Sequence, residues 1–332
     1  MQRVPYDEIL KEFTRVLLKH GFRSDRAELC ARLFAEASRD GVYTHGLNRF
    51  PGFIDYVRKG LVNAQAEPAL IERVGVLERW DGQGGPGPLN AWHCMGRAIE
   101  LAREHGMGCA ALRNTNHWMR PGNYGLRAAD EGCIGICWTN TVALVPPWGG
   151  RTPRLGNNPM VIAVPRAGGP VILDMAMTQF SQGKMQVYRS RGEPLPVEGG
   201  FDREGRLTRD PGAIIESRRP LPIGYWKGSG LALMLDMVAA LLSGGQATHE
   251  ISKPEHETRV SQVFIAFDLR RLAAGEAEQT VNGILDDLHS SDPADDSVRA
   301  QYPGERMLRT RGENLRLGVP VDPAIWQKVT EL

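Results

Sequence analysis

The first 60 residues show the apolar spacing of amphipathic helices. Between residues 9 and 17 apolar side chains recur at helical intervals, and Gly21 follows as a stop signal. A second helix is predicted from Ser24, a suitable N-cap, to Gly41, and a third from about residue 50 to Gly60. The pattern therefore predicts a helical N-terminal region.

Beyond residue 68 short apolar runs typical of strands appear between helical segments. Strands are predicted at ALIERV, VLERW, CAALRN, CIGICW, MVIAVP, VILDMA and VFIAFDL. Helices are predicted at about 89–105, before Gly132, and over KGSGLALMLDMVAALLSGG, which we expect to be a buried helix. The mixed order leaves both α/β and α+β open as the fold class.

Three segments lack a clear period. Residues 139–158 and 189–224 are rich in loop-forming residues and are predicted to be irregular. A polar stretch at 290–304 leads to a short C-terminal helix near 323–331.

Length and composition narrow the class of protein. The 332 residues suggest about two domains, and 42% hydrophobic with 24% charged residues is ordinary for a soluble globular protein. A net charge of +1 gives no basic surplus, so we expect no nucleic-acid partner. The apolar run 231–242 is interrupted by Asp236 and is shorter than the roughly 20 residues of a membrane span.

The chain's N-terminus and its cysteines favour a cytoplasmic location. The segment MQRVPYDEILKEF is charged throughout and lacks the apolar region of a signal peptide. The cysteine count is odd, at five, and the only close spacing, Cys133 and Cys137, is not the C-x2-C of a zinc or thioredoxin-like site. The eight histidines include no H-x3-H pair, so we expect no metal site.

One glycine motif matches the dinucleotide-binding fingerprint. Gly82, Gly84 and Gly87 are spaced as G-x-G-x-x-G between a predicted strand and a predicted helix. The acidic residue that should end the next strand is replaced by Asn114, and Pro86 removes an amide donor. A tight glycine-rich turn is therefore the favoured interpretation.

The sequence Thr44-His45-Gly-Leu-Asn-Arg49 has the residue types that reduction of a 2-oxo acid needs. Histidine can give a proton to a carbonyl oxygen, and arginine matches a carboxylate. If the segment is helical, His45 and Arg49 share one face. Taken alone, a structural histidine and a surface arginine remain the commoner explanation.

Three further groups are candidates with structural alternatives. His117 follows a predicted strand, and could equally cap nearby carbonyls. Lys227, between Trp226 and a Gly-Ser-Gly turn, could hold a pyrophosphate at a helix start, or the glycines could serve packing. Asp174 ends a predicted strand and could bind ribose hydroxyls or cap a turn.

Taken in order, these stretches resemble the malate/L-lactate dehydrogenase family of the non-Rossmann type. The resemblance runs almost end to end and rests on GVYTHGLNRFP, ALRNTNHWMR, GCIGICWTN, PPWGG, LGNNP, LPVEGGFDREG and LPIGYWKGSG. It implies an α/β, α+β-like fold that binds NAD on a large, mainly antiparallel sheet beside a helical domain. The expected division is a helical domain from residues 1–70 with about 290–332, and a cofactor-binding sheet domain at 71–290.

The resemblance also implies an activity and a site. It implies an NADH-dependent homodimer, with NADPH possible, that reduces a 2-oxo acid, with 2,3-diketo-L-gulonate as first candidate. His45 would be the proton donor, and on chemical grounds Arg49 and His117 would contact substrate. Cofactor-binding residues would be Pro170, Val171, Ile172, Leu173, Asp174, Met175, Ala176, Trp226, Lys227, Gly304, Glu305 and Arg306.

Departures and alternatives accompany this expectation. Thr44 stands where the family usually has serine, and Ala176 and Arg306 stand where a serine and a histidine are expected, which leaves the cofactor preference open. A malate, lactate or other 2-hydroxy-acid dehydrogenase is the first alternative. A non-catalytic ligand-binding protein on this fold is the second, and a metal-dependent lyase is a distant third.

Overall fold

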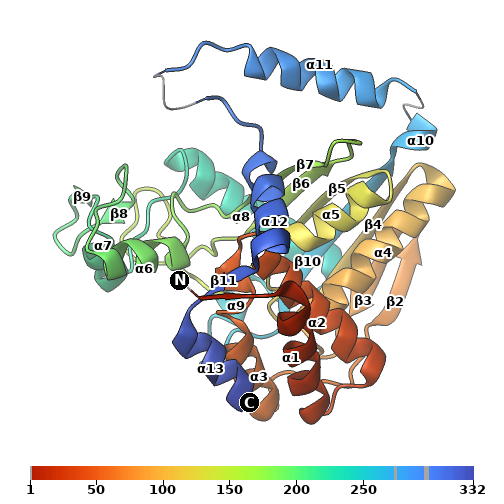
Figure 1. Cartoon of the computed structure of the whole chain (residues 1–332), viewed down its shortest axis with the longest axis horizontal. Coiled ribbons are helices and arrows are strands. Elements are labelled where there is room, and N and C mark those ends of the chain that lie inside the picture. Colours follow the sequence, from red (N-terminus) through yellow and green to blue (C-terminus); the bar gives the residue numbers. More distant parts are fainter. Residues whose placement is uncertain (1, 273–274, 295–298) are drawn as a thin grey trace.

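A seven-stranded sheet forms the centre of the molecule. The computed structural model describes residues 2–272, 275–294 and 299–332. All neighbouring strands of the sheet are antiparallel except β3 and β4, which are parallel and joined through α4 (Figure 1). The strand order is β2 (Ala69–Val74), β3 (Leu77–Asp81), β4 (Met107–Thr115), β10 (Val260–Asp268), β5 (Cys133–Thr139), β6 (Met160–Val164) and β7 (Val171–Met175).

Helices cover both faces of this sheet. α4 (Gly87–His105) and α5 (Gly122–Asp130) pack on one face, and α8 (Trp226–Ser243) packs on the other. Alternate residues of β4 separate accordingly, because Ala110 lies in the cluster with α4 and Ala111 in the cluster with α8. The expected mainly antiparallel sheet with a helical region is confirmed.

Both ends of the chain build the helical layer beside the sheet. α1 (Tyr6–Lys19), α2 (Ser24–Arg39), α3 (Phe50–Arg58) and α13 (Pro323–Glu331) share one hydrophobic cluster. β1 (Gln2–Val4) pairs with β11 (Val319–Val321). In the core, Phe13 stacks on Phe50 with ring centroids 4.0 Å apart. The helical cluster also includes Leu89 and Met119, and the domain division at about residues 70 and 290 stays a prediction.

One of the two long segments predicted to be irregular, residues 189–224, contains regular elements. Residues 182–217 form a small lobe at the left of Figure 1, with α6 (Gln182–Arg191), β8 (Gly200–Phe201), β9 (Leu207–Thr208) and α7 (Pro211–Ser217). Its own small cluster includes Met185, Leu195 and Ile214. The loop at 139–158 has no helix or strand of its own, apart from a bridge between Val145 and Leu155.

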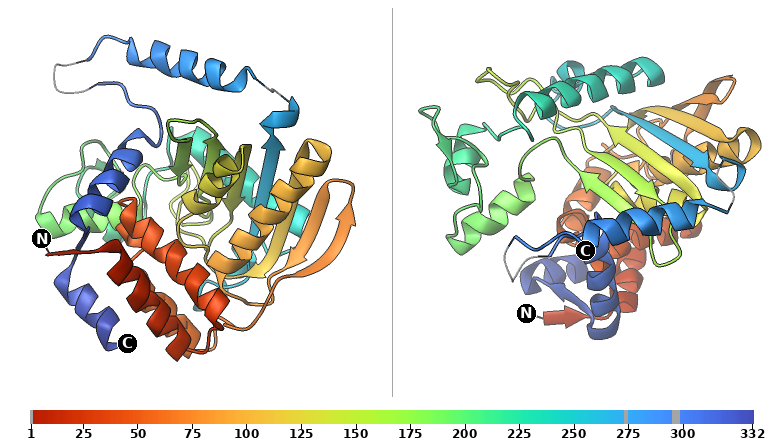
Figure 2. Two further views of the ribbon diagram at one scale, coloured as in Figure 1. Left: turned by 45° about the vertical axis from the view of Figure 1, so that its right-hand side comes forward. Right: turned by 90° about the horizontal axis from the view of Figure 1, so that it is seen from above.

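Two helices near the C-terminus were not predicted. α11 (Ala277–His289) lies apart from the sheet in the left view of Figure 2, and α12 (Glu305–Leu317) lies beside α2. Asn314 is the one residue of α12 that is fully buried. The position of α12 is set largely by polar contacts, which the spacing of apolar residues does not reveal. The short elements are η1 (Tyr43–His45), α9 (Thr248–Ile251) and α10 (Leu269–Leu272).

The prediction that the segment at 226–243 is a buried helix is wrong for much of its surface. Ala232, Leu235 and Ala239 pack on the sheet, whereas Met234 and Leu241 are 54% and 73% exposed. With 18 residues and a mean hydropathy of 1.2, α8 is long and apolar enough to cross a membrane by length and composition alone. A core helix of a soluble protein meets the same criteria, so this is weak evidence of a span.

Candidate active site

A cavity of about 600 Å³ lies where the helical layer meets the sheet, within the usual size range of small-molecule sites. Its wall comes from the turn after α2, the loop after β4, the end of β7 and the start of α12. The lining side chains include Asp40, Tyr43, Thr44, His45, His117, Arg120, Thr141, Asn157, Ile172, Asp174, Met175, Ala176, Ser181, Gly304, Arg306 and Met307.

The turn that carries His45 lies tightly against α2. Ser38 Oγ donates a hydrogen bond to Phe34 O and accepts one from Leu47 N at 2.8 Å. A Cβ on Gly46 would clash with Ser38, since it would come within 2.7 Å of the Ser38 backbone nitrogen. Position 46 therefore requires glycine for the close approach of this turn to α2. The approach fixes the position of His45.

His45 and His117 lie with their rings nearly parallel, 5.8 Å between centroids and 17° between planes. His45 Nδ1 is 3.2 Å from Thr44 Oγ1, so the threonine supplies a hydroxyl in the position where the family has serine. His117 Nδ1 accepts a hydrogen bond from Met119 N–H at 2.9 Å. His117 therefore carries its proton on Nε2 when it is neutral.

The surroundings favour the neutral form of both imidazoles. Burial in the cavity wall lowers the pKa of His45 to about 4, with smaller effects from the charges of Arg49 and Arg120. Burial also lowers the pKa of His117 well below its usual value, and Arg49 and His45 add to this. A bound anion would oppose the effect of the arginines, so the site favours a negatively charged ligand.

Arg49 lies at the start of α3 with its side chain exposed. It makes no ion pair and no side-chain hydrogen bond with any residue that the structure describes. Its charge still acts on both histidines. Arg49 is not among the residues that line the cavity, so its charge acts on the imidazoles from outside the lining, and the guanidinium is available to a ligand.

Six of the expected cofactor residues share the cavity with the two histidines: Ile172, Asp174, Met175, Ala176, Gly304 and Arg306. Asp174 accepts a hydrogen bond from Gly122 N–H at 2.9 Å. Although its side chain is open to the cavity, desolvation by the surrounding protein raises its pKa, against the charge of Arg120. Gly304 has φ +98°, and a Cβ there would come within 2.7 Å of Ile172 Cγ2. β7 and the start of α12 therefore meet closely.

These groups fit a nicotinamide dinucleotide. Arg306 is exposed to the cavity and forms no ion pair within the described chain, so it is free to bind a phosphate. Asp174 can accept hydrogen bonds, and Ile172 offers an apolar surface to a ring. Among the described residues no three His, Cys, Asp or Glu side chains converge as a metal site requires.

Six other expected residues lie outside the cavity. Pro170 borders a separate hollow near α11, Val171 and Leu173 do not line the cavity, and Glu305 pairs with His289 at 3.2 Å. Trp226 and Lys227 begin α8, exposed and away from the cavity.

One glycine in each of two motifs, Gly228 and Gly87, is required by close packing. A Cβ on Gly228 would come within 2.8 Å of the Ile223 side chain. In the G-x-G-x-x-G segment, a Cβ on Gly87 would lie 2.5 Å from the carbonyl carbon of His117. The space that a phosphate would need at Gly87 is filled by the loop of His117, which supports the tight-turn interpretation.

Two charged residues of the cavity wall were not predicted. Asp40 has a fully buried side chain, and Arg120, 2% exposed, donates to it at 2.6 Å. Arg120 belongs to a stretch that carries the family resemblance, but nothing in the local sequence distinguishes it from a surface arginine. Its burial became visible only in the folded chain.

The fold and this site together define an oxidoreductase of 2-oxo or 2-hydroxy acids that does not use a Rossmann domain. A family model described as malate/L-lactate dehydrogenase matches residues 4–330. The chain belongs to this family.

Known proteins match this chain over nearly its full length. A 2,3-diketo-L-gulonate reductase of Citrobacter koseri is 45% identical, with 99% of this chain and all of that protein covered. A crystal structure of malate dehydrogenase from Entamoeba histolytica matches with a TM-score of 0.94 at 28% identity, covering 99% of this chain and 96% of the other. Sulfolactate dehydrogenase from Methanocaldococcus jannaschii matches with 0.90 at 28% identity and the same coverage. The expectation of an oxidoreductase of this family is confirmed.

Proposed function

We propose that this chain is an NAD(P)H-dependent reductase that converts 2,3-diketo-L-gulonate to 3-dehydro-L-gulonate. The observation that carries the proposal is the His45–His117 pair, 5.8 Å apart in one cavity with the expected cofactor residues of β7 and α12. The name of the Citrobacter koseri relative supports the choice of substrate.

The cofactor would lie along Ile172, Asp174, Gly304 and Arg306. When bound, its nicotinamide supplies the hydride that reduces the ketone carbon. NADH is the first candidate. NADPH is the second, because Arg306 is a cation that a 2′-phosphate could bind.

The two histidines would have different roles. His117 is held neutral with Nε2–H as its donor, so it can bind the carbonyl oxygen or a sugar hydroxyl without losing the bond to Met119. His45 would give its proton to the developing alkoxide. The substrate's own carboxylate, bound at Arg49, would offset the arginine charge and raise the pKa of His45 from its low value in the free site.

Arg49 would hold the carboxylate and so orient the ketone. An arginine fork fixes both the position and the rotation of a planar carboxylate. Orientation of this kind can supply a large part of the rate enhancement. The proposed substrate anchor and proton donor thus come from the same short segment after α2.

Oxidation of NADH and NADPH by the purified protein with a panel of oxo acids tests the proposal. We expect the fastest turnover with 2,3-diketogulonate. Turnover of oxaloacetate or pyruvate instead would favour a malate or lactate dehydrogenase; the matching Entamoeba histolytica structure is named a malate dehydrogenase. Cofactor binding without turnover of any oxo acid would favour a non-catalytic ligand-binding protein.

We further propose that the chain is a homodimer and that the outer face of α8 lies in its interface. This face is defined here as Trp226, Leu233, Met234, Met237 and Leu241, which are between 41% and 73% exposed. An apolar surface of this extent along one helix is typical of a protein contact. Trp226 and Lys227 would then lie near the subunit contact.

A cytoplasmic location is the remaining part of the proposal. All five cysteines are free and buried, and burial raises the pKa of Cys109 to about 12. Unreactive free thiols of this kind are compatible with a reducing compartment. Fractionation of cells that produce the tagged chain would test it.

A further inference from the structure

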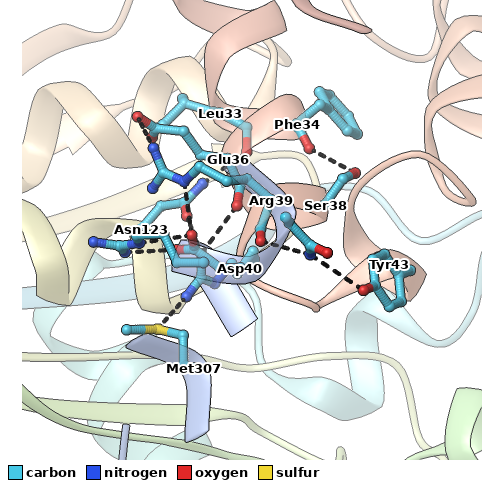
Figure 3. A network of polar contacts seen from close by, with 12 residues as sticks. Leu33, Phe34, Glu36, Ser38, Arg39, Asp40, Tyr43, Asn123 and Met307 are labelled. Carbon is cyan, nitrogen blue, oxygen red and sulfur yellow. Dashed lines mark hydrogen bonds and ion pairs between the residues drawn. The ribbon is translucent and has the colours of Figure 1, made fainter. Parts of the chain in front are cut away.

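A buried carboxylate joins three parts of the cavity wall. Asp40 follows α2, and both of its carboxylate oxygens accept hydrogen bonds from arginines (Figure 3). Arg311 of α12 donates from Nε at 2.8 Å and from Nη2 at 2.7 Å, Arg120 donates at 2.6 Å, and Arg39 donates at 2.8 Å. We call these four residues the Asp40 cluster.

Three members of the cluster lie near a residue of the candidate site in sequence. Asp40 precedes His45 by five residues, Arg120 follows His117 by three, and Arg311 follows Arg306 by five. Arg120 also donates to Met307 Sδ at 2.9 Å, so it touches α12 directly. The cluster therefore links the histidine segments to the helix that begins with the expected cofactor residues.

Met307 of α12 is partly buried against the cluster of α4 and α5, but no apolar residue of the helix is fully buried. Asn314 is its only fully buried residue, and it donates to Arg39 O at 2.8 Å. The charge-assisted bonds of Arg311 are strong because the Asp40 side chain is completely buried. Loss of the Asp40–Arg311 pair should therefore let the start of α12 move.

We propose that Asp40 is a positioning residue of this site. Through Arg311 and Arg120 it holds Gly304 and Arg306 of the cofactor segment at a fixed distance from His45 and His117. This inference rests on the proposed function in one respect, which is that the cavity takes a nicotinamide cofactor.

Arg311→Gln tests the link with little risk to folding, because the Arg311 side chain is 26% exposed. We expect the Kd for NADH to rise about tenfold. The midpoint of thermal unfolding should fall, because two bonds to a fully buried carboxylate are lost, so the Kd is measured well below that midpoint. Arg311→Lys keeps the charge without the planar fork. Its Kd for NADH should lie between those of the wild type and Arg311→Gln. Arg309→Gln is the matched control, since Arg309 is exposed on the same helix and has no ion pair within the described residues.

Hydrogen exchange gives a readout that needs no turnover. The backbone amides of residues 308–311, of which Leu308 N–H donates to Gly304 O at 3.0 Å, should exchange at least about threefold faster in Arg311→Gln than in Arg309→Gln. Asp40→Asn should give larger changes in both measurements, since three arginines then lose their carboxylate. If Asp40→Asn does not fold, the Arg311→Gln variant alone tests the positioning role of Asp40.

The outcomes separate this inference from the proposed function. Wild-type NADH affinity and wild-type exchange in Arg311→Gln would overturn the positioning role. A wild-type protein that binds NADH but reduces no oxo acid would remove the proposed reaction and leave the inference to the same two measurements. If the wild type binds neither NADH nor NADPH, the cofactor proposal fails and the exchange rates alone decide whether the Asp40 cluster fixes α12.

Discussion

In the cavity wall, the buried charged side chains of Asp40 and Arg120 are held by partners from the same chain, whereas the outer face of α8 exposes apolar side chains. Asp40 is fully buried against three arginines, while Leu241 is 73% exposed. Buried charges are stable only when they are paired, and a large exposed apolar surface indicates a missing partner. The difference suggests that one chain fixes the catalytic geometry and that a second copy covers α8. Substitutions in the two regions should then have separable effects.

The largest effect is expected for His45→Ala. Loss of the proton donor should lower kcat for 2-oxo acid reduction roughly 10²–10⁴-fold, the usual contribution of general acid catalysis. Oxidation of NADH at saturating substrate measures it, and the oligomeric state should not change. His105→Ala, an exposed histidine at the end of α4, is the control. A loss in kcat smaller than about tenfold would assign the proton transfer to another group.

Arg49→Gln should act on substrate binding. The loss of a charge-assisted hydrogen bond to the carboxylate should raise KM for the oxo acid roughly 10–100-fold. The Kd for NADH should stay unchanged, because Arg49 does not line the cavity beside β7 and α12. An unchanged KM would mean that the carboxylate binds elsewhere, with Arg120 or Arg306 as the next candidates.

Substitutions on the outer face of α8 should change self-association. Met237→Glu together with Leu241→Glu should weaken self-association by at least about 30-fold, since charges would enter an apolar contact. Light scattering after gel filtration should then show the 36.7 kDa mass of a single chain. Leu18→Glu, on an exposed position of α1, is the control. A wild type that is already monomeric at all concentrations would refute the proposed dimer.

The smallest effect concerns pH. His45 must carry its proton to act as donor, so kcat/KM for reduction should fall as pH rises through the pKa of His45, and kcat/KM for oxidation should rise. With that pKa lowered to about 4 in the free site, the reductive limb should lie on the acid side of neutrality. Arg49→Gln removes a positive charge and should move the limb toward higher pH. A limb that shifts toward lower pH would contradict the assigned electrostatics.

Much of the fold followed from local patterns. The strands at 133–139 and 260–268 are apolar runs next to turn residues, and they were predicted because strand periodicity and glycine stops are local features. α12 was missed because its sequence is dominated by charged residues, and its contacts run through Arg311 and Asn314. For α8 the prediction was wrong in the opposite direction, because its apolar composition predicted burial on all sides.

Part of the candidate site was predictable because it also depends on local features of the sequence. His45 and Arg49 lie in one short segment, and the family resemblance points to it directly. The pairing of His45 with His117, 72 residues later in the chain, depends on the approach of two loops. The importance of Asp40 and Arg120 was not visible, because a charged residue in sequence reads as a surface residue until burial shows otherwise.

The sequence by itself determined the strands of the seven-stranded sheet, seven of the helices, the family and the residue types of the chemistry, since these depend on local spacing and on short motifs. The tertiary structure alone decided which of those residues share a cavity, because that depends on contacts between segments such as Asp40 with Arg311, 271 positions apart. It also decided which apolar surface stays uncovered. Burial, and with it the charge state of His45 and the exposure of α8, is a property of the packed chain and of no single segment.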